Sequence, residues 1–190
     1  LGKFEMQRIT SYMISDPKYV PSLLGGYREA AVGNYRWFQN YLDWYVGDNS
    51  ISFNGMALAM DLASGITEER LGQVKAEAET ALLGDATNFP MPHLRGVIDG
   101  IDLGEDFRSP FESDRPALIL SGTLDGRTYP AAHREIASGF SEEGIVTIEN
   151  AGHNLFFSHP DLSQIIVDFY RGASPEDMNL ETDPPEFLDD

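Results

Sequence analysis

In the first half of the chain, hydrophobic residues recur every three or four positions, and Gly and Pro interrupt this spacing at intervals. Apolar residues at this spacing line one face of an amphipathic helix. The pattern therefore predicts helices, and no strand, up to about residue 104. The expected helices cover residues 4–14, 17–24, 27–46, 54–63 and 67–83.

The helix expected at residues 67–83 has the clearest boundaries. Thr67 is a favourable N-cap, and the two glutamates that follow it suit the positive end of a helix dipole. Gly84 follows the last apolar position and is a preferred helix terminator. These signals predict both ends of this helix.

After Arg115 the hydrophobic pattern changes. Two short runs of apolar and β-branched residues, 117–120 and 145–148, stand between turn residues. Such runs are typical of strands in a buried parallel sheet. Residues 130–140 between them predict a crossover helix that begins with a proline, and a further amphipathic helix is expected before Gly172.

The two patterns divide the chain into three parts. We expect a helical region over residues 1–104, an α/β segment over residues 105–172 and an acidic, Pro-rich tail over residues 173–190. The tail is expected to be mobile unless its apolar side chains hold it to a surface; these are Met178, Leu180, Phe187 and Leu188. Because two strands do not make an independently stable sheet, the sheet is expected to be incomplete without a second segment.

The chain is strongly acidic, with 31 Asp and Glu against 13 Lys and Arg and a formal net charge of −18. Such a field repels phosphate backbones and anionic lipids, so we expect neither nucleic acid nor a membrane as a partner. Without cysteines the chain has no disulfides and no thiol catalysis, and its compartment stays open. None of the four histidines has a partner at metal-ligand spacing, so we expect no metal and no cofactor.

Two residues that carry chemistry follow the two expected strands. Asp125 lies in the turn after the first strand, and His153 lies in the turn after the second. By itself, an Asp before Gly is usually a turn former, and a single His is usually structural or solvated. Together they indicate a site, because right-handed crossovers bring successive ends of parallel strands to one edge of the sheet, where ligands bind.

The segments around these two residues resemble a known family. Residues 120–128, Leu-Ser-Gly-Thr-Leu-Asp-Gly-Arg-Thr, and residues 150–155, Asn-Ala-Gly-His-Asn-Leu, are similar to the C-terminal portion of α/β-hydrolases of the prolyl iminopeptidase and tripeptidyl aminopeptidase type. The helical region, with Gly-Met-Ala-Leu-Ala-Met at residues 55–60, resembles the lid or cap of that family. The resemblance implies that Asp125 is the acid and His153 the base of a Ser-His-Asp triad.

The chain departs from this family because it lacks the nucleophile. The serine should come first, on a G-x-S-x-G elbow, and no such elbow occurs in residues 1–190. The chain opens at Leu1 with neither an initiator Met nor a signal peptide, so we expect this start to be a cut edge. The serine and the oxyanion donors are therefore expected from a partner, most simply the N-terminal hydrolase segment, and the chain alone is expected to be inactive.

The expected substrate is a small peptide cut at its N-terminus, or an ester. The aromatic stretch at residues 35–45 is a candidate lining for the substrate, although rings at helical spacing more often form the core of a lid. Candidate anchors for a substrate amino group are Asp43, Asp48 and Asp61. Two other functions stay open: a non-catalytic helical binding module with a vestigial hydrolase tail, and a dehalogenase-like hydrolase whose nucleophile is an Asp on the missing elbow.

Overall fold

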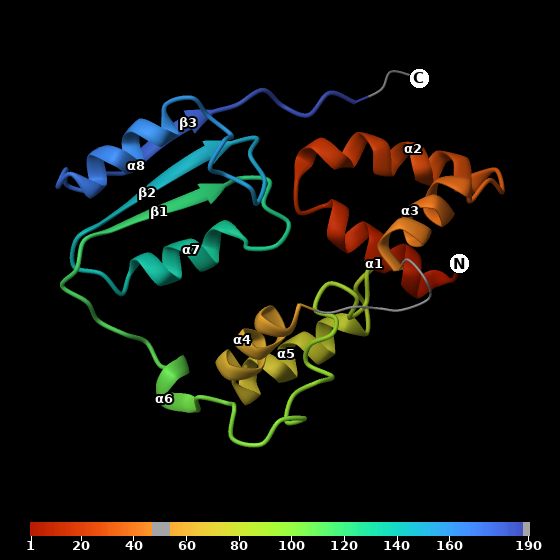
Figure 1. Ribbon diagram of the computed structural model, residues 1–190, viewed down its shortest axis with the longest axis horizontal. Coiled ribbons are helices and arrows are strands. Elements are labelled where there is room, and N and C mark those ends of the chain that lie inside the picture. The colour runs from red at the N-terminus through yellow and green to blue at the C-terminus, as the bar shows by residue number, and fades with distance from the viewer. Residues whose placement is uncertain (47–53, 188–190) are drawn as a thin grey trace. The chain divides into compact units, whose positions relative to one another are not determined.

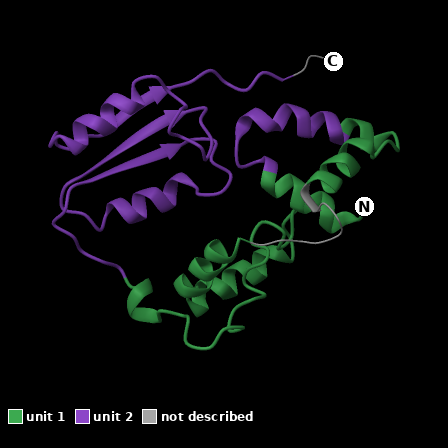
Figure 2. Ribbon diagram, in the orientation of Figure 1, with its two compact units in different colours: residues 1–12, 28–109 green, residues 13–27, 110–190 purple. Residues whose placement is uncertain are grey.

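A computed structural model describes residues 1–46 and 54–187 and shows a mixed α/β protein. The chain divides into two compact units (Figure 2). The helical unit contains Leu1–Tyr12 and Arg28–Ser109, and the sheet unit contains Met13–Tyr27 and Pro110–Asp190. The hydrophobic pattern predicts one helical region over residues 1–104, whereas the segment Met13–Tyr27 groups with the sheet. The sheet unit is therefore built from two separate parts of the chain.

Among the described residues, six α-helices precede the first strand; Figure 1 shows their arrangement within the chain. They are α1 (Lys3–Met13), α2 (Val20–Ala31), α3 (Arg36–Val46), α4 (Gly55–Ser64), α5 (Glu68–Ala78) and α6 (Glu105–Arg108). The predicted N-cap at Thr67 is confirmed, since its side chain accepts a hydrogen bond from the Arg70 N–H, but the predicted end at Gly84 is wrong, because α5 already ends at Ala78. The single helix expected at residues 27–46 is wrong. The chain turns between α2 and α3, where Gly33 adopts a φ of 89° that favours glycine and ends the helix.

The sheet contains three parallel strands. They are β1 (Ala117–Gly122), β2 (Glu143–Glu149) and β3 (Met178–Glu181), in the order β1-β2-β3. The two strands expected from the sequence are confirmed as β1 and β2, and the expected helices after them are α7 (Pro130–Ala137) and α8 (Leu162–Tyr170). Because β1 and β2 run in parallel, their C-terminal ends reach the same edge of the sheet.

Helices α7 and α8 cover opposite faces of the sheet (Figure 1). On one face, Val146 and Ile148 of β2 and Leu162 of α8 are fully buried in one hydrophobic cluster. On the other face, His133 Nδ1 of α7 lies 2.8 Å from Ser121 Oγ of β1. The strands are thus held on both sides just before they end.

The third strand corrects the expectation of a two-stranded sheet with a mobile tail. Met178 and Leu180 alternate with polar residues and pack against the hydrophobic cluster under α8. The Asp177 carboxylate accepts a hydrogen bond from the Ile145 N–H at 2.9 Å and aligns the tail with β2. Of the other apolar tail residues, Phe187 is exposed and Leu188 lies outside the described residues. The segment is thus held by two apolar residues at strand spacing and by its pairing with β2.

Candidate active site

Asp125 lies in a tight turn directly after β1. Its Oδ1 accepts hydrogen bonds from the backbone N–H groups of Arg127 at 2.8 Å and Thr128 at 3.0 Å. This Asx turn is the local structure that Asp favours before Gly. It fixes the direction of the carboxylate and leaves Oδ2 for a different partner.

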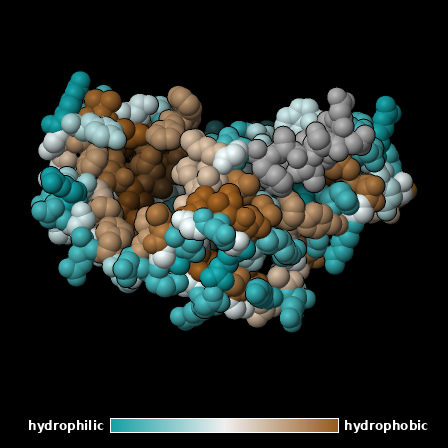
Figure 3. All heavy atoms as spheres, turned by 60° about the horizontal axis from the view of Figure 1, so that its bottom comes forward, coloured by the Kyte–Doolittle hydropathy of each residue, from teal (hydrophilic) through white to brown (hydrophobic). Residues whose placement is uncertain are grey.

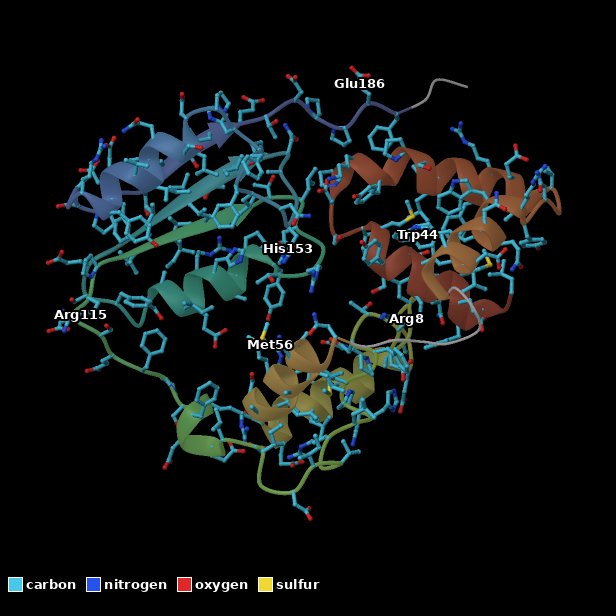
Figure 4. All side chains as sticks on the ribbon, viewed as in Figure 1. Arg8, Trp44, Met56, Arg115, His153 and Glu186 are labelled. Atoms are coloured by element: carbon cyan, nitrogen blue, oxygen red, sulfur yellow. The ribbon has the colours of Figure 1, made fainter. Side chains whose placement is uncertain are left out.

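That partner is His153, in the loop after β2. His153 Nδ1 lies 3.0 Å from Asp125 Oδ2. The Asp125 side chain is 3% exposed, whereas the His153 side chain is 34% exposed. A carboxylate at Nδ1 selects the tautomer with the proton on that nitrogen, so Nε2 is free to accept a proton. The predicted convergence of the two residues is therefore present in the sheet unit, and Figure 4 shows His153 beyond the ends of β1 and β2.

The environment of Asp125 favours its ionised form. Burial by itself would raise the pKa of this carboxyl. The hydrogen bonds from the Thr128 and Arg127 N–H groups and from His153 outweigh burial and lower the pKa below its ordinary value. A buried carboxylate that stays charged is suited to stabilise an imidazolium beside it.

The two loops that carry this pair are hydrogen-bonded to each other. The Leu124 N–H donates to the Ala151 carbonyl at 2.9 Å, and the Asn150 N–H donates to Thr123 Oγ1 at 3.0 Å. A Cβ on Gly122 would lie 2.5 Å from the Ala151 oxygen, so only glycine permits this approach. These contacts hold the two loops side by side.

Asn150 is a part of the site that the sequence analysis did not identify. It adopts a φ of 64°, and its Nδ2 donates to the Thr182 carbonyl at 2.9 Å, just after β3. The tail thereby helps to hold the loop that leads to His153. The sequence signal was an Asn directly after a strand, a residue that tolerates this backbone conformation well.

The other histidines have structural partners. His93 Nε2 lies 2.8 Å from Asp85 Oδ2, and His159 Nδ1 accepts a hydrogen bond from the Asp161 N–H. His133 contacts Ser121, which is 2% exposed and therefore out of reach of a substrate. In the described ranges, no cluster of three His, Asp or Glu side chains is arranged to hold a metal ion.

The candidate substrate-binding residues of the aromatic stretch belong to the helical unit. On α3, the Trp37 and Tyr41 rings are stacked with centroids 6.0 Å apart, and Trp44 is 70% exposed. Asp43 accepts a hydrogen bond from the Gln39 side chain, and Asp61 is exposed on α4. Asp48 lies outside the described residues.

No protein-family model matches the chain, and no curated protein or solved structure matches it either. Among the residues described, none of the helices combines the length and apolar character needed to cross a bilayer. A functional proposal therefore rests on the geometry of the site and on the order of its residues in the chain.

Proposed function

We propose that this chain supplies the acid and the base of a Ser-His-Asp triad in a serine hydrolase of the α/β-hydrolase fold. The observation that carries the proposal is the 3.0 Å contact between Asp125 Oδ2 and His153 Nδ1, at the edge where two parallel strands end. An acid and then a histidine, each directly after a strand, follow the chain order of that fold. The helical unit has the role of its lid.

The proposed chemistry follows from the two side chains. The serine oxygen attacks a carbonyl carbon while His153 Nε2 takes the proton from the serine hydroxyl. His153 then gives this proton to the leaving group. Asp125 holds the imidazole in the required tautomer and stabilises the imidazolium. Two backbone N–H groups anchor the carboxylate throughout these steps. The serine and the oxyanion donors come from a partner segment.

The edge strand β1 supports the proposal of a partner. In the part of the chain that the structure describes, β1 pairs with a strand on one side only, and an open strand edge presents unpaired backbone groups. Phe156 and Phe157, close after His153, are 67% and 99% exposed. Figure 3 shows further hydrophobic side chains at the surface. A second polypeptide that brings a serine to His153 would cover such groups.

The proposed substrate is a short peptide with a free amino terminus. The net charge of −18 and the family resemblance favour a cationic group on the substrate, whereas a plain esterase has no need of one. We expect the enzyme assembled with its partner to cleave a free aminoacyl anilide at least about 30-fold faster, in kcat/KM, than its N-acetylated twin, because a lost charged hydrogen bond costs about 2–5 kcal/mol.

A short-chain nitrophenyl ester is the third substrate in this assay. Equal rates on the two anilides, or activity on the ester alone, would move the proposal from aminopeptidase to esterase. Activity on none of the three would contradict both.

A further inference from the structure

A short segment from the other end of the chain touches both loops of the site. Residues 14–17, called the strap, connect α1 to the 3-10 turn Pro17–Tyr19 and lie within the sheet unit. The Ser15 carbonyl accepts a hydrogen bond from the backbone N–H of His153 at 2.9 Å. The residue that carries the imidazole is therefore held by its own main chain.

Two glycines create the space for the strap. A Cβ on Gly152 would contact Pro17 Cδ and lie 2.8 Å from Asp16 Cα. A Cβ on Gly126, next to Asp125, would contact the Ile14 carbonyl. Real Cβ atoms do not approach other atoms this closely, and neither glycine has a positive φ. Close approach to the strap is thus the reason for glycine at both positions.

The strap has its own supports. Ser15 and Asp16 are buried, and Asp16 Oδ1 accepts a hydrogen bond from the Lys18 N–H at 3.2 Å. Asp16 Oδ2 forms an ion pair with Lys18 Nζ at 3.1 Å, and the Tyr19 N–H donates to the Asp16 carbonyl at 3.1 Å. A segment fixed in this way restricts the position of the loop that it contacts.

We propose that the strap is a positioning element for the triad. It holds the His153 backbone, and with it the imidazole, at the distance that the bond to Asp125 requires. A bond of this kind depends on sub-ångström placement, which a surface loop alone does not provide. The catalytic meaning of the strap rests on the proposed function, whereas its grip on His153 is measurable in this chain without any substrate.

Amide hydrogen exchange, followed by NMR on the full 190-residue chain, tests the strap. The His153 amide should exchange as slowly as the amides within β2, because a native hydrogen bond to Ser15 protects it. Exchange at the rate of an exposed loop amide would overturn the proposal whether or not the chain turns out to be a hydrolase.

Variants then test the coupling to the imidazole. Gly152→Ala should speed exchange of the His153 amide by about 10- to 100-fold, the range that overpacking brings, and should broaden or abolish the downfield Nδ1–H resonance of the Asp125–His153 bond. The matched control is Gly25→Ala in α2, where a Cβ meets nothing within 4 Å, and it should change neither signal. A sharp, unshifted Nδ1–H resonance in a folded Gly152→Ala chain would show that the strap does not position His153.

Discussion

The two oxygens of the Asp125 carboxylate have different partners. One is held by backbone N–H groups and the other by the imidazole of His153. Because Oδ1 is held by the backbone, the carboxylate keeps one orientation and Oδ2 stays directed at the histidine. The 3% exposure of its side chain keeps water from competing for either oxygen.

Replacement of Asp125 by asparagine tests its role in the tautomer. In the enzyme assembled with its partner, Asp125→Asn should keep the fold and lower kcat by about 10⁴, the loss that follows when a triad acid no longer selects the tautomer. The control is Asp114→Asn, since the Asp114 side chain is 94% exposed. Activity of Asp125→Asn near that of the native enzyme would remove Asp125 from the triad.

The lowered pKa of Asp125 predicts how stability changes with pH. The folded chain binds this proton less tightly than the unfolded chain, whose aspartates have a pKa of about 3.9. The carboxylate therefore stabilises the fold fully at pH values above about 3.9, and this contribution is lost as the pH falls through the lower folded pKa. Urea unfolding at several pH values should show a smaller loss of stability in acid for Asp125→Asn than for the native chain. Parallel curves for both would contradict the assignment.

At the scale of elements, β3 has a larger part than its four residues suggest. It extends the sheet beside β2, and the carbonyl of Thr182 after it accepts a hydrogen bond from Asn150 in the loop before His153. The tail thus stabilises both the core and the site.

A pair of neighbouring variants in β3 tests this contribution. Leu180→Ala should lower the free energy of unfolding by about 2 kcal/mol, at the low end for a buried leucine because Leu180 is only partly buried. Glu181→Ala, one position along and exposed, should change it by less than about 0.5 kcal/mol. Chemical denaturation measures both, and equal effects would mean that the strand does not pack as described.

The elements that could be predicted from the sequence are those that a local pattern marks. β1, β2 and the helices around them were predictable because apolar runs and turn residues mark them locally, and Asp125 and His153 were found because they follow those runs. β3 was missed because two apolar residues in an acidic, Pro-rich stretch give a weak signal. The strap was missed for a different reason: its contacts are made by the backbone of residues far away in the chain, and such contacts leave no pattern in side-chain chemistry.

For the molecule as a whole, we propose that catalysis needs a serine from outside this chain. Among the described residues, the unpaired edge of β1 and the exposed Phe156 and Phe157 support this proposal.

Labelling with a fluorophosphonate probe, which reacts with activated serines, tests whether a partner supplies this serine. The chain is purified under native conditions together with its copurifying polypeptides. The sample is treated with the probe and analysed by intact mass spectrometry. We expect one label on a second polypeptide, at a serine within G-x-S-x-G. The labelling rate should fall by at least about 10³-fold in His153→Ala and stay unchanged in His133→Ala. The absence of a labelled partner, or a label that persists undiminished in His153→Ala, would contradict the proposal.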